Sequence, residues 1–302
     1  MAEISHVRHV ISGRVIHKLQ TISDKPPVME SSPIGMFDSG LGGLTVFEKL
    51  SKLLPKESVI YLADTARMPY GGRSPNEIIK INIEILNFLV GLGVKLIIMA
   101  CGTSSAIAYP AIKDKYKIPI VGMIEGGAKM AAASTKNKKV GIIATVGTIN
   151  SGAYQKAIST IDKKIEVQGV ACPLLVPLIE GGFSGSEETA KVLKEYLKPL
   201  IRLKVDTLIL GCTHYPHLSN MITSILGPSV SLVDPAEEAA RTTKDILAKL
   251  KMLSVDKDPP EYRFYVTGSA NSFKELGSRL YGKLLPNVEE ISIKPTKYRS
   301  LP

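Results

Sequence analysis

Two of the chain's three cysteines end apolar runs and are followed at once by polar residues. Cys101 lies in "IIMACGTSSA" and Cys212 in "LILGCTHYP". Cysteine can act as a base or as an acid, because its unperturbed pKa of about 8.5 lies near the working range of pH. Two thiols on opposite faces of a carbon would remove a proton on one side and return it on the other, inverting the stereocentre. We therefore interpret these cysteines as candidate acid/base groups.

Neighbouring residues could adjust the ionisation of the two thiols. Hydroxyl residues that can cap a helix follow Cys101, and His214 follows Cys212. A helix start or a nearby histidine favours the thiolate. Asp38, which closes an upstream apolar run, is the candidate helper for Cys101, although by itself it could equally cap a helix. Cys172, in "VACPLLVP", is interpreted as a small hydrophobic core residue.

The elements that must position these groups alternate from residue 34 onward. Apolar side chains recur at helical spacing over residues 46–54, and the capping-box sequence at 74–77 predicts a helix that runs to the glycines at 91 and 93. Strand-like runs occur at "IGMFDSG", "SVIYLAD", "VKLIIMAC", "IPIVGM", "KVGIIAT", "IEVQGVAC", "DTLILGC", "VSLVD" and "YRFYVTG". This alternation predicts parallel α/β sheets.

A weak internal repeat indicates two similar halves. Val94 precedes Cys101 by seven residues, and Val205 precedes Cys212 by seven. We predict an α/β fold of two pseudo-symmetric α/β lobes with mainly parallel sheets. Ligands bind at the carboxyl ends of the strands in open α/β sheets. The active site is therefore expected in the cleft between the lobes, with a thiol on either side.

Composition limits the classes of function. No stretch has the ~18 to 20 apolar residues of a membrane span, the first thirty residues lack a secretory core, and three cysteines favour a reducing, cytoplasmic compartment over a disulfide framework. The net charge is +10, but the basic residues are scattered along the chain, and the densest cluster of lysines, at 136–139, has no interleaved aromatic residues. We predict no nucleic-acid binding and no membrane association.

Five motifs together resemble one enzyme family. "IGMFDSGLGGLTV", "YLADTARMPYGGRS", "ACGTSSA", "PLIEGG" and "GCTHYP" are similar, in this order over about residues 34–285, to the glutamate racemases of the cofactor-independent aspartate/glutamate racemase superfamily. The resemblance implies interconversion of L- and D-glutamate with no cofactor and no metal. It also implies a cytoplasmic homodimer that supplies D-glutamate for peptidoglycan synthesis, and hence for cell-wall biogenesis and cell shape.

The resemblance also implies how the chain is divided. Residues 34–124 and 228–302 would form the first lobe, and 125–227 the second, inserted lobe. Residues 1–33 would be an extension, which we expect to be disordered unless the true start is Met29.

Site roles carry over position by position. Cys101 resembles the base that acts on the D-enantiomer, and Cys212 the one that acts on the L-enantiomer. Asp38 and His214 resemble the groups that assist them, and Glu180 a further acid near the second thiol. The substrate-binding positions would be Asp38, Ser39, Tyr70, Gly71, Gly102, Thr103, Thr148, Thr213 and His214.

Gly102 is the one departure from the family pattern, which usually has asparagine after the first cysteine. If the missing side chain made a charge-assisted hydrogen bond, its loss would cost roughly 1.5 to 3 kcal/mol. A catalytically impaired member that binds an acidic amino acid or a partner protein is therefore an alternative. Aspartate racemase is another, but that relative commonly has glutamate after the threonine of "GCTH".

Two further site types are disfavoured by the motifs themselves. "SGLGG" resembles a phosphate loop, but Thr45 stands where a dinucleotide fingerprint has its third glycine, and Asp64 continues into "TARMPYGG" rather than ending as a ribose ligand. No CxxC or HxxxH spacing completes a zinc site with Cys212 and His214.

Overall fold

The computed structural model describes residues 10–11, 14–15, 29–285 and 287–293. Most of the predicted extension at 1–33 lies outside these residues. Within it, β1 (Val10–Ile11) pairs antiparallel with β2 (Arg14–Val15). The described helices include none that is both long and apolar enough to cross a membrane.

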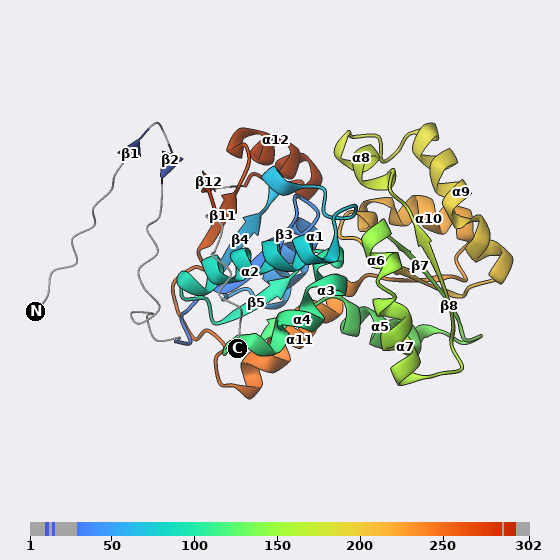
Figure 1. Cartoon of the computed structure of the whole chain (residues 1–302), viewed down its shortest axis with the longest axis horizontal. Coiled ribbons are helices and arrows are strands. Elements are labelled where there is room, and N and C mark those ends of the chain that lie inside the picture. Colours follow the sequence, from blue (N-terminus) through green and yellow to red (C-terminus); the bar gives the residue numbers. More distant parts are fainter. Residues whose placement is uncertain (1–9, 12–13, 16–28, 286, 294–302) are drawn as a thin grey trace, which may run out of the picture.

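The first lobe has a six-stranded, wholly parallel sheet (Figure 1). Its strand order is β12-β11-β4-β3-β5-β6. The strands are β3 (Ile34–Asp38), β4 (Val59–Ala63), β5 (Leu96–Met99), β6 (Ile120–Val121), β11 (Tyr262–Val266) and β12 (Val288–Glu290). The helices of this lobe are α1 (Leu44–Leu53), α2 (Pro75–Gly91), α3 (Gly102–Ile107), α4 (Tyr109–Ile112), α11 (Pro235–Lys249) and α12 (Ala270–Tyr281).

The second lobe has a four-stranded parallel sheet in the order β10-β9-β7-β8. Its strands are β7 (Lys139–Ala144), β8 (Glu166–Ala171), β9 (Thr207–Leu210) and β10 (Ser231–Val233). Its helices are α5 (Ile124–Ser134), α6 (Val146–Asn150), α7 (Ala153–Ile161), α8 (Leu175–Glu180), α9 (Glu187–Leu203) and α10 (Ser219–Leu226). Because β10 pairs with β9, this sheet extends past residue 227, where the sequence-based division ends the second lobe.

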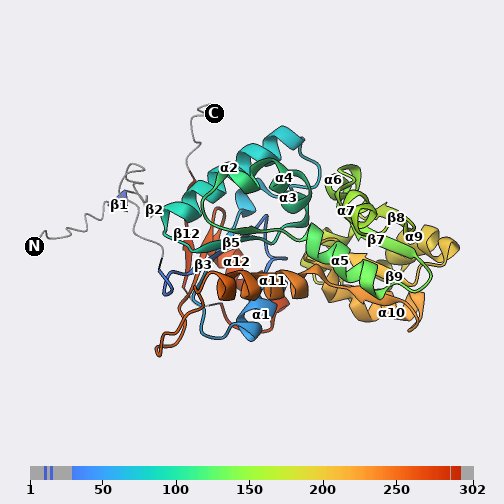
Figure 2. The ribbon, with the colours of Figure 1, turned by 90° about the horizontal axis from the view of Figure 1, so that it is seen from below.

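The two sheets share one topology, which gives the predicted pseudo-symmetry a structural basis. The order β4-β3-β5-β6 in the first lobe corresponds to β8-β7-β9-β10 in the second. Cys101 follows β5 and Cys212 follows β9, so the two thiols occupy equivalent places at carboxyl ends of strands. Figures 1 and 2 show the lobes side by side, with α3 and α5 near their junction.

Alternate residues of the central strands pack into cores on opposite faces of each sheet. In β3, Ile34 and Met36 belong to one buried cluster and Phe37 to the other. In β7, Ile142 and Ile143 divide in the same way. Burial on both faces explains the nearly continuous apolar runs of these strands.

Local signals set the start of α2 as predicted. The Ser74 hydroxyl accepts the amide of Glu77 at 3.4 Å, and the Glu77 carboxylate accepts the amide of Ser74 at 3.1 Å. This reciprocal pair satisfies two amides that have no partner within the helix.

A buried ion pair ties three segments together at the amino-terminal edge of the first sheet. Lys95 Nζ lies 2.6 Å from Glu57 Oε2, and both residues are almost completely buried. The same ammonium donates to the carbonyl oxygens of Met252 at 2.8 Å and Glu30 at 2.5 Å. The Glu57 carboxylate balances the charge of the buried ammonium, and the two carbonyl oxygens accept two of its three protons.

Candidate active site

The first half of the site is the end of β3, where Asp38 is buried. Its Oδ2 accepts the amides of Gly40 at 3.2 Å and Gly43 at 3.1 Å, while Oδ1 has no hydrogen-bond partner among the described residues. Burial raises the pKa of Asp38, and the positive charge of His214 together with the loop amides opposes this shift. The "DSGLGG" loop therefore fixes one carboxylate oxygen and leaves the other without a partner.

The Cys101 thiol lies beside this carboxylate, at the start of α3. Its Sγ is 3.8 Å from the hydroxyl oxygen of Ser39. Burial and the nearby charge of Asp38 together raise the pKa of Cys101 to about 12, against smaller opposing effects of hydrogen bonds with Ser104 and Ser39. The expected gain in thiolate from the helix start is thus outweighed by burial. At neutral pH Cys101 carries its proton.

The second half of the site joins Cys212, His214 and Glu180. His214 Nδ1 lies 3.9 Å from Cys212 Sγ, and Nε2 lies 2.8 Å from Glu180 Oε1. Burial lowers the pKa of His214, but hydrogen bonds with Cys212 and Glu180 and the negative charge of Asp38 raise it to about 10. Both ring nitrogens are therefore protonated at neutral pH, and His214 presents an imidazolium to the Cys212 sulfur.

The two thiols thus have opposite electrostatic surroundings. Cys101 lies near an acidic group and is protonated, whereas Cys212 lies beside the protonated ring of His214. One side is suited to give a proton and the other to take one.

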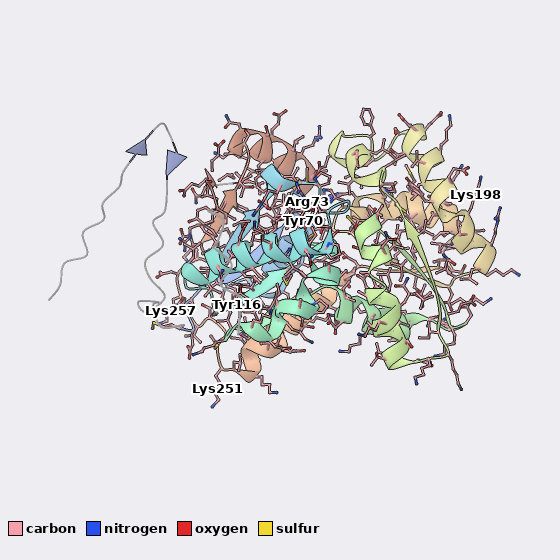
Figure 3. The ribbon with its side chains drawn as sticks, in the orientation of Figure 1. Tyr70, Arg73, Tyr116, Lys198, Lys251 and Lys257 are labelled. Carbon is pink, nitrogen blue, oxygen red and sulfur yellow. The ribbon has the colours of Figure 1, made fainter. Side chains whose placement is uncertain are left out.

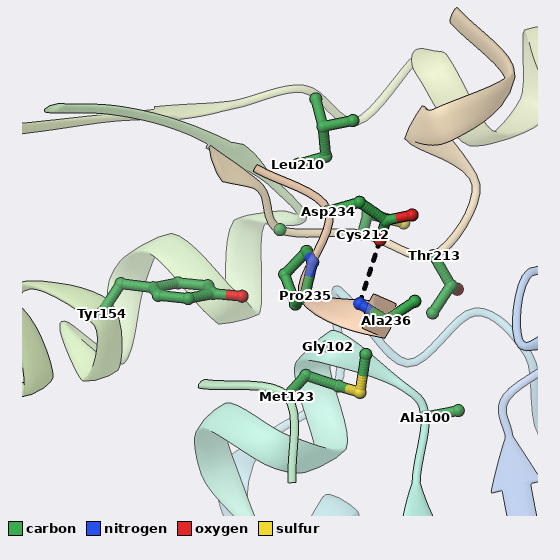
Figure 4. Close-up of a pocket in the computed structure, with 11 residues that line it drawn as sticks. Ala100, Gly102, Met123, Tyr154, Leu210, Cys212, Thr213, Asp234, Pro235 and Ala236 are labelled. Atoms are coloured by element: carbon green, nitrogen blue, oxygen red, sulfur yellow. Dashed lines mark hydrogen bonds between the residues drawn. The ribbon is translucent and has the colours of Figure 1, made fainter. Parts of the chain in front are cut away.

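Two hydrogen bonds to backbone carbonyl oxygens join the lobes. The Thr45 hydroxyl donates to the Thr213 carbonyl oxygen at 3.0 Å, and the Gly147 amide donates to the Gly71 carbonyl oxygen at 2.9 Å. A cavity lies at this junction, beside Cys212, and Figure 4 shows residues that line it. The cavity has a volume of about 10 Å³, enough for about one water molecule.

The hydroxyl positions predicted to bind substrate meet at the same junction. Thr103 Oγ1 of the first lobe lies 2.8 Å from Thr145 Oγ1 of the second, which is 3.0 Å from Thr148 Oγ1. Thr145 was not predicted. It caps the start of α6 by accepting the amide of Thr148, so the spacing of hydroxyl residues in "ATVGT" was the signal that could have found it.

The Tyr70 hydroxyl forms a hydrogen bond within the first lobe. The hydroxyl donates to Asp64, which also accepts Arg67 Nε at 2.7 Å and the Thr267 hydroxyl at 2.8 Å. Figure 3 shows Tyr70 on the part of the first lobe nearest the second. Asp64, considered above only as a ribose ligand, instead fixes the loop that carries Gly71.

Cys172 lies in the core of the second lobe, as predicted. Its Sγ donates to the Val170 carbonyl oxygen at 3.5 Å, and burial raises its pKa to about 12. Within the described part of the chain, no three histidine, cysteine or acidic side chains lie close enough together to hold a metal ion.

Comparison with known proteins gives one consistent family. Residues 34–243 match the Asp/Glu/hydantoin racemase family. A glutamate racemase of Lactococcus lactis is 42% identical over 89% of this chain and 97% of its own length. The crystal structure of a glutamate racemase from Bacillus anthracis has a TM-score of 0.85 at 38% identity, covering 89% of this chain and all of that one. The Francisella tularensis glutamate racemase, in complex with D-glutamate, has a TM-score of 0.83 at 38% identity, covering 88% and 99%.

Proposed function

This chain belongs to the Asp/Glu/hydantoin racemase family and racemises glutamate, and on that premise we propose that Cys101 and Cys212 exchange the α-proton from opposite faces. The observation that carries the proposal is the opposite charge surroundings of two thiols at equivalent strand ends. The reaction is an isomerisation that leaves every other atom of the substrate in place.

In the direction from L to D, Cys212 acts as the base. As a thiolate held by the His214 imidazolium, it takes the α-proton of L-glutamate and becomes a thiol. Cys101, protonated at rest, gives its proton to the opposite face of the α-carbon and becomes the thiolate. The total number of protons is unchanged, but the turnover leaves the proton on Cys212 and the thiolate at Cys101. This form is ready to act in the D-to-L direction, and proton exchange with solvent must restore the first form before another L-to-D turnover.

Asp38 and Glu180 assist their thiols in different ways. Asp38, whose Oδ1 has no hydrogen-bond partner in the described part of the chain, can accept a proton or hydrogen bond from Cys101 or from the substrate ammonium. Glu180 acts through His214, whose charge it stabilises. Hydroxyls and amides at Ser39, Thr103, Thr148 and Thr213 would hold the substrate carboxylates, to which such donors are well suited.

A single labelling assay tests this function. The purified chain, given L-glutamate in D₂O with no added cofactor, should form D-glutamate with deuterium at the α-position. D-glutamate formed without solvent deuterium, or activity that disappears when pyridoxal phosphate is removed, would refute the two-thiol mechanism. L-aspartate serves as the parallel substrate, and faster turnover of aspartate than of glutamate would overturn the choice of substrate.

The D-glutamate product is used in peptidoglycan precursor synthesis, the role of this enzyme family. We propose that the chain acts as a homodimer in the cytoplasm, which the family resemblance supports; its three cysteines, all unpaired, fit a reducing compartment. Sedimentation velocity at micromolar concentration should give about twice the chain mass of 32.6 kDa, and a single species at the chain mass would contradict the dimer.

A further inference from the structure

Gly102 and Gly211 form a backbone-to-backbone contact between the lobes. A Cβ placed on Gly102 would lie under 3.0 Å from the Gly211 carbonyl oxygen, 3.4 Å from its carbonyl carbon and 3.9 Å from the Cys212 Cα. These are main-chain atoms, which cannot rotate out of the way as a flexible side chain can. With any side chain at 102, the two lobes could not approach as closely as they do.

This contact lies next to both thiols. Gly102 follows Cys101 directly, and Gly211 precedes Cys212 directly, so the separation of the two glycines influences the separation of the two thiols. Gly102 and Gly211 both line the cavity beside Cys212, which has room for about one water molecule and not for an amino acid.

Two cross-lobe hydrogen bonds lie beside the same contact. Thr103, next to Gly102, meets Thr145 of the second lobe, and the Gly147 amide donates to Gly71. Gly147 lies in the first turn of α6, where amides have no partner within the helix. Its protection from solvent therefore depends on the first lobe being in place.

We propose that Gly102 is a positioning residue, whose missing side chain lets the lobes close until their backbones touch. A side chain at this position acts as a wedge that holds Cys101 and Cys212 further apart. The proposal goes beyond the racemase chemistry, because the contact would have the same effect on any substrate bound between the thiols.

Amide hydrogen exchange followed by NMR tests this on the full chain. Gly102→Ala should increase the exchange rate of the Gly147 amide by about tenfold or more, because overpacking a close contact shifts equilibria by that order. The amides of Ile97 and Cys172, which donate to Pro119 and Ala144 within single lobes, should keep their rates. These two references separate lobe opening from general loss of stability.

Gly185→Ala is the matched control, since a Cβ there meets nothing within 4 Å. It should leave the Gly147 amide unchanged. Equal Gly147 exchange in Gly102→Ala and Gly185→Ala would overturn the proposal, whether or not either protein racemises glutamate.

The wild-type chain provides a second test if Gly102→Ala does not fold. Its Gly147 amide should exchange at least about tenfold more slowly than a free peptide of the same sequence. Exchange at the free-peptide rate would mean that the lobes do not rest in the closed contact, and would equally overturn the proposal.

Discussion

The charge on His214 depends on Glu180, and Glu180→Gln should show this in the pH dependence of racemisation. The carboxylate accepts His214 Nε2 at 2.8 Å, and its side chain is only 17% exposed. A glutamine of nearly the same shape keeps a hydrogen bond but removes the negative charge. The substitution therefore tests the charge and not the packing.

The expected size follows from the type of bond that is lost. A hydrogen bond to a charged group contributes about 1.5 to 3 kcal/mol, and 1.36 kcal/mol corresponds to one pH unit. The pKa of His214 is raised to about 10 in the wild type, so kcat/KM for L-glutamate should fall as pH rises through about 10. In Glu180→Gln this basic limb should move down by about one to two pH units.

The contribution of charged His214 to the stability of the fold should also be lost as pH rises. The pKa of His214 is raised from 6.5 to about 10 on folding, so its contribution is complete below pH 6.5 and is lost as pH rises toward 10. The free energy of unfolding, measured in urea, should therefore fall over this window in the wild type and less so in the variant.

Initial rates from pH 6 to 11, in each direction, provide the assay. Glu188→Gln, at an exposed position of α9, is the matched control and should retain the wild-type profile. A basic limb that stays in place in Glu180→Gln would refute the assignment of His214 as an imidazolium held by Glu180.

Other substitutions give separate tests. Cys101→Ser and Cys212→Ser should each reduce racemisation below detection. Each variant retains one thiol, which should still catalyse elimination of a leaving group from a substrate analogue of matching chirality. Near-normal racemisation by either variant would exclude the two-thiol mechanism. Cys172→Ser should change kcat by less than about twofold, since its sulfur is buried in the core of the second lobe and bonds only to the Val170 carbonyl oxygen among the described residues. Lys95→Met should lower the free energy of unfolding by about 3 to 5 kcal/mol, because it leaves the buried Glu57 carboxylate without its cation; chemical denaturation measures this, and a loss under about 1 kcal/mol would contradict it.

Gly102 shows where sequence comparison and structure lead to different expectations. The family pattern suggests that asparagine at 102 would restore a substrate contact and raise kcat/KM. In the structure, any Cβ at 102 meets the Gly211 carbonyl, so asparagine would also separate the lobes. The change in kcat/KM in Gly102→Asn therefore depends on two opposing effects: the added contact with the substrate and the wider separation of the lobes.

The sequence by itself determined the elements and the chemistry. Strands buried on both faces have apolar runs, and capping residues such as Ser74 mark helix starts, because these signals depend only on neighbours in the chain. The places of Cys101 and Cys212 after such strands, with the motifs around them, predict two opposed thiols, and the structure has each thiol at the carboxyl end of its strand. The edge strand β12, "VEE", escaped prediction because it is short and carries two acidic residues.

Only the tertiary structure decided how the site is charged and how closely it shuts. The pairing of His214 with Glu180, the burial that keeps Cys101 protonated, and the approach of Gly102 to Gly211 all join segments far apart in the chain. Periodicity and capping carry no information about such distances, because they arise when separate elements pack. The sequence therefore supplied the two thiols, while tertiary packing placed Asp38 near one of them and the His214–Glu180 pair beside the other.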